Sequence, residues 1–541
     1  MIALVLQLWV SDSTYGPRAR GALVIDGASA HISGRSATVR RAGDSVLATF
    51  PDSEGEFRGV IGSGGSLAGF WVQPRGMISR VEYATPVTFR RLGANKWRGD
   101  VRPLDEHFVL YMRMVADSGV TFRVPERNYL GGQGYARYFI RHDGDSVRFV
   151  DTTHTFDAFT GHMEAGRIRV HWPGVDAPLT LRPATPAQTT AYYPRPPGAK
   201  YTYRTPLPDA DGWRTSKAAD AGMDEAALAA IVQKIGETDP VPRTAPLIQS
   251  LLIARHGRLV LDEYFFGFDA DRLHDLRSGG KTFTSVMVGA AHVDMNTLVY
   301  PIFGDPPSDK SRITVGHLLT HSSGLACDDN DDNSPGNEDK MYNQTAQPDW
   351  YRFILDLSVV HDPGSVYAYC SGGINLALGV VSRTTGEWLP AFFERAVAKP
   401  LGIDHWAMNL MPTGDGYGGG GLYLRPRDLL KLGVAYLDSG VWQGRRVVSA
   451  AWVQQSTAKQ IVTGPETWDG YGWHLNILHA PGHDYQDYEA TGNGGQLLIV
   501  VPELDLAVAF TAANYNRYTI WKNFRDGITL KEIIPAIRSP Q

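Results

Sequence analysis

The hydrophobic pattern changes across residues 183–215, and this change limits what the chain can fold into. Before this segment, short apolar and polar runs alternate and are broken by Gly and Asp, which is typical of β-strands joined by tight turns. The segment itself is rich in Pro, Thr and Tyr and has no helical or strand periodicity. We therefore predict a β-rich domain over residues 1–182, a linker over residues 183–215 and a second domain over residues 216–541.

The amino-terminal domain is predicted to be an all-β barrel or sandwich, with a lipocalin-like barrel as one form. The tetrapeptide Gly-Asp-Ser-Val occurs at residues 43–46 and again at residues 144–147, where Gly-Asp suits a tight hairpin turn. The repeat indicates either an internal duplication or, more simply, two turns of similar chemistry. The aromatic residues Phe70, Trp71 and Trp97 either line a ligand cavity or, as most aromatic residues do, pack in the core.

The second domain has a mixed pattern. Residues 224–236 predict an amphipathic helix that begins at an Asp and ends at a Gly. Residues 248–266 predict two strands that turn at His256-Gly257-Arg258. A helix, a hairpin and then further helices indicate an α+β domain.

A Ser-x-x-Lys motif opens the helical run that follows the hairpin, where residues 276–283 read Leu-Arg-Ser-Gly-Gly-Lys-Thr-Phe. Residues three apart share one face of a helix, so Lys281 can bring its amine to the Ser278 hydroxyl, and the helix N-terminus favours negative charge there. An acyl-transfer serine enzyme needs such a nucleophile with a base in reach. The motif alone occurs by chance roughly once or twice in a chain of this length, so its meaning depends on its surroundings.

Two further segments supply groups that this chemistry needs. Tyr369 precedes an apolar helical run, where its phenol can take part in proton transfer, and the hydroxyl of Ser371 can hydrogen-bond the lysine amine. Residues 490–496 read Ala-Thr-Gly-Asn-Gly-Gly-Gln before a predicted strand. Glycines there let a strand edge approach the substrate, so its amides can donate to an oxyanion.

With these motifs in this order, the chain from about residue 222 to its end resembles the serine β-lactamase, penicillin-binding-protein and family VIII carboxylesterase superfamily. The landmarks are Ser278-x-x-Lys281, residues 313–325, Pro363-Gly364 with Tyr369-Cys370-Ser371, residues 418–434, and Tyr471-Gly472-Trp473. The resemblance implies a DD-peptidase-like antiparallel sheet flanked by helices, together with an all-helical subdomain.

The resemblance also implies the site. The catalytic residues would be Ser278, Lys281, Tyr369 and Ser371. The backbone amides of Ser278 and Asn493 would form the oxyanion hole, and the substrate cleft would be bordered by Gly492, Gly494 and Gln496.

Two departures from the family pattern bear on the substrate. Where the family often has Tyr-x-Asn, this chain has Tyr369-Cys370-Ser371, and where penicillin-recognising enzymes have Lys-Thr-Gly, it has Ala490-Thr491-Gly492. Without that lysine, a contact to a β-lactam carboxylate worth about 1.5–3 kcal/mol is lost. This pattern is similar to the branch of the 6-aminohexanoate-oligomer hydrolases and their esterase-active relatives.

We therefore expect a small-molecule ester or linear amide as substrate. The alternatives are a β-lactamase or D-amino-acid peptidase of the same fold, a catalytically silent binding protein, and a β-rich functional module that carries the hydrolase as cargo. A formal net charge of -5 without a long basic run gives no reason to expect nucleic acid as a partner.

No cofactor and no metal are expected. The sequence has no Walker, dinucleotide or H-E-x-x-H motif. The acidic loop of residues 327–333 has oxygen ligands suited to calcium but lacks the spacing of an EF-hand, so a solvated loop is the preferred interpretation.

The two cysteines, Cys327 and Cys370, lie near the predicted site because the family packs residues 313–325 against it. They form either a disulfide or two separate buried thiols. A disulfide would slightly favour a periplasmic or secreted location over a cytoplasmic one.

The apolar opening, residues 2–10, is too short for a membrane span and fits a first β-strand or the remnant of a leader. The oligomeric state is left open.

Overall fold

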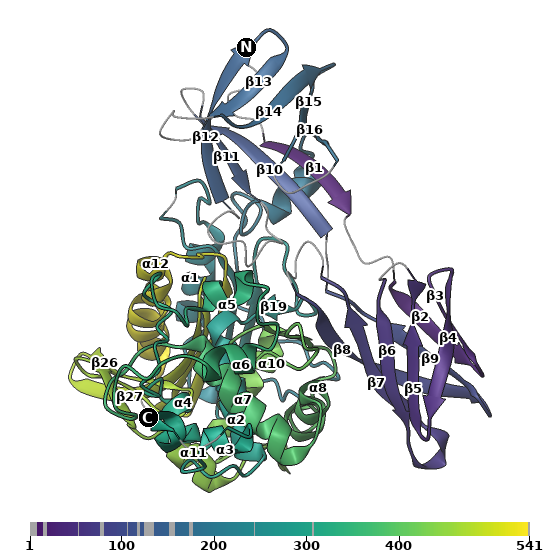
Figure 1. Cartoon of the computed structure of the whole chain (residues 1–541). Helices are drawn as coiled ribbons and strands as arrows, with labels where there is room; N and C mark the ends of the chain where they lie inside the picture. The colour runs from purple at the N-terminus through teal and green to yellow at the C-terminus, as the bar shows by residue number, and fades with distance from the viewer. Residues whose placement is uncertain are drawn as a thin grey trace.

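The structure is a computed structural model of the chain. It describes residues 8–14, 19–51, 54–75, 81–104, 107–115, 119–123, 135–150, 157–172, 177–242, 244–305 and 308–538. These residues form an all-β amino-terminal region and a carboxy-terminal domain of mixed sheet and helices (Figure 1). The expected fold class, an α+β domain preceded by all-β structure, is confirmed.

Eight antiparallel strands form a closed barrel at one end of the molecule (top of Figure 1). They are β1 (Leu8–Thr14), β10 (His107–Val115), β11 (Gly119–Arg123), β12 (Tyr135–Asp143), β13 (Ser146–Val150), β14 (Asp157–Glu164), β15 (Arg167–Val170) and β16 (Leu179–Pro183). β1 pairs with both β10 and β16, and this removes the free edges that an open sheet would have. Trp9, Phe149 and Leu181 are among the side chains that fill the barrel.

A second β-unit is inserted in the chain between β1 and β10. Its strands are β2 (Gly21–Asp26), β3 (Ser29–Ile32), β4 (Arg35–Ala42), β5 (Ser45–Thr49), β6 (Glu56–Ile61), β7 (Leu67–Gln73), β8 (Tyr83–Gly93) and β9 (Lys96–Val101). They pair in chain order, and β9 returns to pair with both β2 and β8. Where the sequence predicted one barrel or sandwich, the structure therefore has two β-units.

The two Gly-Asp-Ser-Val segments lie at hairpin turns, as predicted. Gly43 and Gly144 have φ values of 59° and 58°, in the left-handed region that such turns require. They connect β4 to β5 and β12 to β13. Trp71 and Trp97 are buried in the core of the second β-unit, which confirms core packing for these two aromatic residues.

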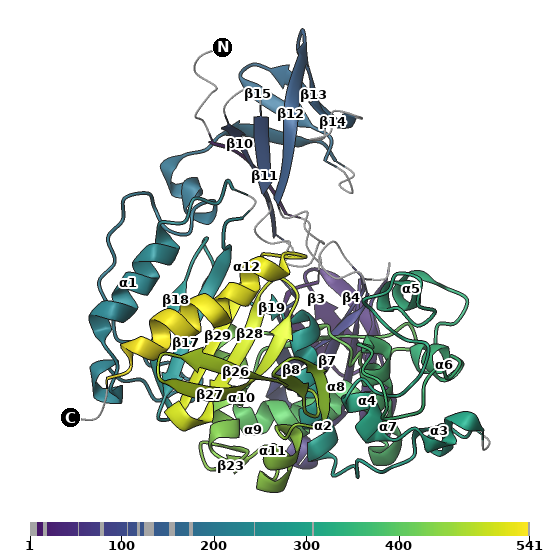
Figure 2. The same cartoon turned by 90° about the vertical axis from the view of Figure 1, so that its left-hand side faces the viewer.

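The carboxy-terminal domain is built on an eight-stranded antiparallel sheet (Figure 2). Its order is β18 (Arg258–Tyr264), β17 (Ile248–Arg255), β29 (Leu506–Ala512), β28 (Gln496–Val501), β27 (His483–Gly492), β26 (His474–Ala480), β25 (Thr467–Asp469) and β24 (Ile461–Gly464). Strand β28 is apolar after its first residue because both of its faces are covered. Leu497 and Ile499 pack toward the terminal helices, and Leu498 and Val500 pack toward the opposite layer.

Helices cover both faces of this sheet. α1 (Glu225–Gly236), α12 (Tyr518–Asn523) and the helical turns of Phe524–Ile533 lie on one face, whereas α2 (Gly280–Ala290) and α10 (Pro426–Leu437) lie on the other (Figure 2). A helical layer packs against α2 through α7 (Ser371–Thr385). The other helices are α3 (Val299–Ile302), α4 (Val315–Leu319), α5 (Glu338–Asn343), α6 (Trp350–Leu355), α8 (Leu389–Phe393), α9 (Lys399–Leu401) and α11 (Ala450–Ser456). No helix in the described ranges is both long and apolar enough to cross a membrane.

The second β-unit is joined to the carboxy-terminal domain by strand pairing. β8 pairs with β20 (Ala407–Asn409), β20 with β21 (Leu422–Leu424), and β21 with β19 (His274–Asp275). This sheet therefore runs from the β-unit to a point three residues before Ser278.

The predicted linker packs along the carboxy-terminal domain. Trp213 is buried in that domain's core, and the Tyr201 hydroxyl donates to Glu263 at 2.6 Å. Arg427 binds Asp211 of the linker at 3.1 Å. The domain limits given above stay a prediction.

Candidate active site

Ser278 and Lys281 lie in the first turns leading into α2. Ser278 is in the helical turn Arg277–Gly279, directly before the helix begins at Gly280. The Asp275 carboxylate accepts a hydrogen bond from the Arg277 amide at 2.8 Å and so fixes the entry to this turn. The Lys281 amine donates to Ser278 Oγ at 3.1 Å. The contact inferred from the three-residue spacing is therefore present.

The Lys281 amine is buried in a polar setting. It also donates to the Gly419 carbonyl at 2.5 Å and lies 4.9 Å from the centre of the Tyr369 ring. Burial opposes the charge of the amine, but the electrostatic interactions of the amine with Tyr369, Glu338 and Asp329 outweigh burial and raise the pKa of Lys281. The ammonium form of Lys281 is thus favoured.

Tyr369 lies just before α7, and a histidine that the sequence analysis gave no role supports it. The rings of His321 and Tyr369 are 4.5 Å apart, and the Cys370 amide donates to His321 Nδ1 at 3.0 Å. Burial lowers the pKa of His321 to about 3, which keeps its ring neutral and able to accept this bond. His321 falls within the landmark segment of residues 313–325, but no spacing rule links it to Tyr369.

Ser371 is buried at the first turn of α7. Its backbone amide donates to the Asp329 carboxylate at 2.7 Å. The Lys281 amine donates to Ser278 and Gly419, and a role for the Ser371 hydroxyl in orienting Lys281 stays a prediction.

The acidic loop is only partly the solvated loop that was expected. Asp331 and Asp332 are exposed, but Asp329 is half-buried. The Asp329 carboxylate accepts from the amides of Ser371 and Glu338 at 2.7 and 2.8 Å. The sequence interpretation fails at Asp329 because its partners are remote along the chain. In the described part of the chain, no group of three or more His, Cys, Asp or Glu residues is arranged to hold a metal.

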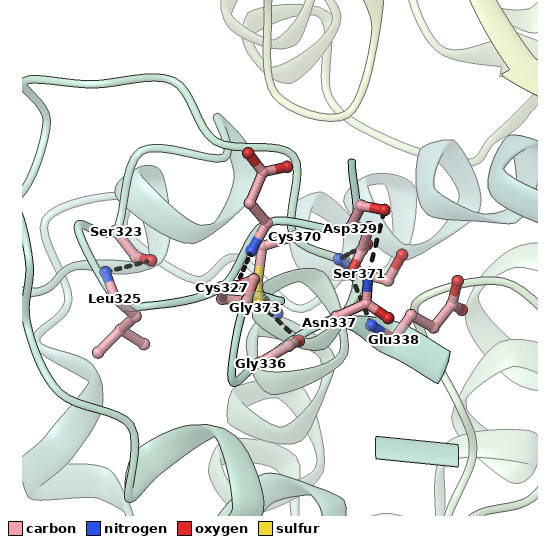
Figure 3. The surroundings of a disulfide bond; sticks show 12 residues. Ser323, Leu325, Cys327, Asp329, Gly336, Asn337, Glu338, Cys370, Ser371 and Gly373 are labelled. Carbon is pink, nitrogen blue, oxygen red and sulfur yellow. Dashed lines mark hydrogen bonds between the residues drawn. A yellow bond between two sulfur atoms is a disulfide. The ribbon is translucent and has the colours of Figure 1, made fainter. Parts of the chain in front are cut away.

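A disulfide joins this loop to the Tyr369 segment. Cys327 and Cys370 are bonded, with their Cα atoms 5.4 Å apart (Figure 3). Of the two alternatives that the sequence left open, the structure has the bridge. It ties the acidic loop to the residue between Tyr369 and Ser371.

The disulfide leads to a testable expectation for stability. Replacing Cys327 and Cys370 together by Ser should lower the free energy of unfolding by about 3–4 kcal/mol, because the bridge closes a loop of 43 residues. Urea unfolding of the double variant and of the native protein measures this difference. Thiol titration of the denatured, unreduced protein should find no free thiol, and two free thiols would contradict the bridge.

The glycine-rich segment at the end of β27 lies against the Ser278 turn. A Cβ atom on Gly492 would come within 2.0 Å of the Leu276 carbonyl, so only glycine allows this approach. Gly494 has a φ of 100°, a conformation that favours glycine. The close packing of the strand end on the turn is compatible with an oxyanion hole formed by the amides of Ser278 and Asn493, which stays a prediction.

The side chains of this segment have structural partners. The Asn493 side chain donates to the Asn516 side-chain oxygen at 2.7 Å. The Gln496 side chain is buried in β28 and donates to the Ala512 carbonyl at 2.6 Å, which draws it into the sheet. The predicted contacts of Gly492, Gly494 and Gln496 with substrate also stay predictions.

A further charged pair interacts with Tyr367 and His321. Asp469 and His474 are 2.6 Å apart. Burial opposes the charge on His474, but Asp469 outweighs burial and raises the pKa of this histidine. Asp469 and His474 are not among the predicted site residues, because they belong to no recognised motif, although they lie close in sequence to Tyr471-Gly472-Trp473.

Comparison with known proteins identifies relatives of the carboxy-terminal domain. Residues 249–518 match the family model described as Beta-lactamase. The 6-aminohexanoate-dimer hydrolase of Paenarthrobacter ureafaciens is 28% identical over 225 residues, which cover 39% of this chain and 57% of that protein. The D-alanyl-D-alanine-carboxypeptidase/endopeptidase AmpH of Escherichia coli (strain K12) is 23% identical over 254 residues, which cover 41% of this chain and 64% of that protein.

The chain thus spans less than two thirds of the length of these two curated relatives. Among solved structures, a family VIII carboxylesterase is 20% identical, with 56% of this chain and 94% of that chain covered and a TM-score of 0.43.

Proposed function

Because residues 249–518 belong to the β-lactamase family, we propose that this serine hydrolase cleaves uncharged carboxylic esters and linear amides through an acyl-enzyme on Ser278. The observation that carries the proposal is the 3.1 Å contact between the Lys281 amine and Ser278 Oγ, with the Tyr369 ring beside the same amine. A nucleophile, a proton-transfer partner and a helix N-terminus meet at one point.

In the proposed mechanism, Ser278 Oγ attacks the substrate carbonyl and loses its proton to the Lys281 and Tyr369 pair. The factors that raise the pKa of Lys281, namely Tyr369, Glu338 and Asp329 acting against burial, support the ammonium form of the lysine. The phenolate form of Tyr369 is then the group that accepts the Ser278 proton, and the phenol so formed passes this proton to the leaving alcohol or amine. Water attacks the acyl-enzyme by the same route in reverse.

The residue at position 490, on strand β27, supports the proposed substrate class. Ala490 occupies the position where penicillin-recognising enzymes carry a lysine, so this strand offers no cation to a β-lactam carboxylate. One relative is named as a hydrolase of 6-aminohexanoate dimers, which contain a linear amide. The similarity to a D-alanyl-D-alanine carboxypeptidase makes a D-amino-acid peptidase the second candidate.

A labelling and substrate screen tests the proposal. A fluorophosphonate probe should label the native protein on Ser278. Short-chain nitrophenyl esters and 6-aminohexanoate dimer should then be hydrolysed faster than nitrocefin and a D-alanyl-D-alanine peptide. Faster turnover of either of the last two would replace the proposed substrate class, and no labelling at all would favour a catalytically silent protein.

The amino-terminal β-structure is proposed to limit the size of the substrate. The sheet that contains β8 continues through β20 and β21 to β19, next to the Ser278 turn. Phe70 of the second β-unit also packs against Trp388 of the carboxy-terminal domain, with ring centres 5.3 Å apart. These contacts place the β-unit beside the domain that holds the site.

A truncation tests this size limit. The shortened chain should begin at Ala184, because Trp213 and other linker residues belong to the packing of the carboxy-terminal domain. We expect the ratio of rates on long-chain to short-chain nitrophenyl esters to rise several-fold. An unchanged ratio in a truncated protein that keeps a cooperative thermal transition would contradict the proposed limit.

A further inference from the structure

We propose that Asp329 is a positioning residue of the site, which fixes the backbone on both sides of Cys370 and balances the charge of Lys281. The inference rests on the proposed roles of Ser278, Lys281 and Tyr369. It assigns a function to the acidic loop that the sequence treats as solvated.

Asp329 makes two hydrogen bonds to the backbone, one on each side of Cys370. The Asp329 amide donates to the Tyr369 carbonyl at 2.7 Å, and its carboxylate accepts from the Ser371 amide at 2.7 Å. Figure 3 shows Asp329 and Ser371 beside the disulfide that joins the two segments. These bonds fix the peptide groups that follow Tyr369, and therefore the direction in which its side chain leaves the backbone.

Asp329 is itself held from three directions. The disulfide anchors the loop at Cys327, two residues before Asp329. The Asn337 side chain donates to the Asp329 carbonyl at 3.3 Å, and the Glu338 amide donates to the Asp329 carboxylate at 2.8 Å. Because the Asp329 carboxylate is held in place by these contacts, it can fix the position of the Ser371 amide that it binds.

His321 holds the same segment from the other side. Its Nδ1 accepts from the Cys370 amide at 3.0 Å, and its carbonyl accepts from the Ala368 amide at 2.8 Å. The backbone from Ala368 to Ser371 is thus bound between two chain segments. Such support is what a proton-transfer group needs if it is to stay within hydrogen-bond reach of the nucleophile.

The charges around Lys281 give Asp329 a second effect. The electrostatic interactions of the amine with Tyr369, Glu338 and, more weakly, Asp329 outweigh burial and raise the pKa of Lys281. The other charged or titratable groups nearby are Asp275 with Arg277, Asp469 with His474, the neutral His321, and Tyr417, whose hydroxyl donates to Glu338 at 2.5 Å.

Removing the charge of Asp329 therefore lowers the pKa of Lys281. If the ammonium form is the active one, the enzyme then loses activity at a lower pH. The high-pH limb of the rate profile should therefore move to lower pH.

The test compares Asp329→Asn with Asp332→Asn, which removes the same charge from an exposed position in the same loop. The readouts are kcat/KM for a short-chain nitrophenyl ester between pH 6 and 11, and fluorophosphonate labelling of Ser278. We expect Asp329→Asn to lower kcat/KM by about tenfold and to shift the high-pH limb downward. Asp332→Asn should match the native protein.

A second variant separates position from charge. Asp329→Glu keeps the charge but displaces the carboxylate, so we expect a lower rate with the high-pH limb unchanged. An unshifted limb in Asp329→Asn would overturn the inference even if the rate falls, because a merely structural role predicts only the fall. Loss of the thermal transition in both variants would also overturn it and make Asp329 a residue of general stability.

The experimental results distinguish failure of the inference about Asp329 from failure of the proposed function. If the native protein is labelled and Asp329→Asn has native kinetics, only the inference about Asp329 fails. If the probe does not label native Ser278, the proposed function fails, and the inference fails with it.

Discussion

Ser278→Ala is expected to abolish hydrolysis of esters and amides while the fold stays intact. The rate should fall by a factor on the order of 10⁴ or more, because the hydroxyl forms the covalent bond to the acyl group. The substitution removes a single oxygen from the turn before α2. The Lys281 amine keeps its bond to the Gly419 carbonyl, so the buried charge is not left without a partner.

The measurement for Ser278→Ala is steady-state hydrolysis together with fluorophosphonate labelling. Ser285→Ala is the matched control, since Ser285 lies on the same helix and its hydroxyl donates to the Tyr471 carbonyl rather than to the site. The control should keep labelling within a few-fold of the native protein. Turnover by Ser278→Ala at the native rate would remove Ser278 from the mechanism.

The sequence predicted the local part of the site and missed the part made by distant segments. The contact between Ser278 and Lys281 follows from their spacing on one helix face, so local geometry was enough to expect it. The Gly419 carbonyl, His321 and Asp329 reach the same site from remote parts of the chain. Their positions depend on tertiary packing, which spacing along the sequence does not encode.

In the amino-terminal region, too, the sequence predicted local structure but not how distant segments pack. Alternating apolar residues predicted strands and turns, and the turns at Gly43 and Gly144 are where they were expected. The alternation of apolar and polar residues shows which face of a strand is buried, but it does not show which other strand it pairs with. The insertion of β2–β9 between β1 and β10 was therefore invisible in the pattern.

The acidic loop was misread for a related reason. Four Asp residues among residues 328–332 resemble a solvated segment by composition. The bridge from Cys327 to Cys370 draws the loop toward α7 and turns one of these carboxylates inward. A disulfide that ties this loop to the Tyr369 segment was one of the two alternatives for the cysteines, but the pairing alone does not say which of the four carboxylates turns inward.

Lys281→Ala and Tyr369→Phe are each expected to lower kcat/KM by about a hundredfold or more, the scale of a lost proton-transfer group. Tyr369→Phe is the sharper variant, because the ring keeps its contact with His321 and only the phenol is lost. Lys281→Ala removes the cation beside both Ser278 and Tyr369, so it should impair acylation as strongly as Tyr369→Phe does.

The matched control for the tyrosine is Tyr367→Phe. Tyr367 is two residues away in the same segment, and its ring lies 5.8 Å from that of His321, but its phenol bonds Asp469. Removing that phenol should leave the rate within a few-fold of the native value. If Tyr369→Phe and Tyr367→Phe lose activity equally, the segment acts only as a support. If Tyr369→Phe runs at the native rate, the proton from Ser278 must pass through Lys281 alone, and the ammonium form favoured by its surroundings would then be the inactive one.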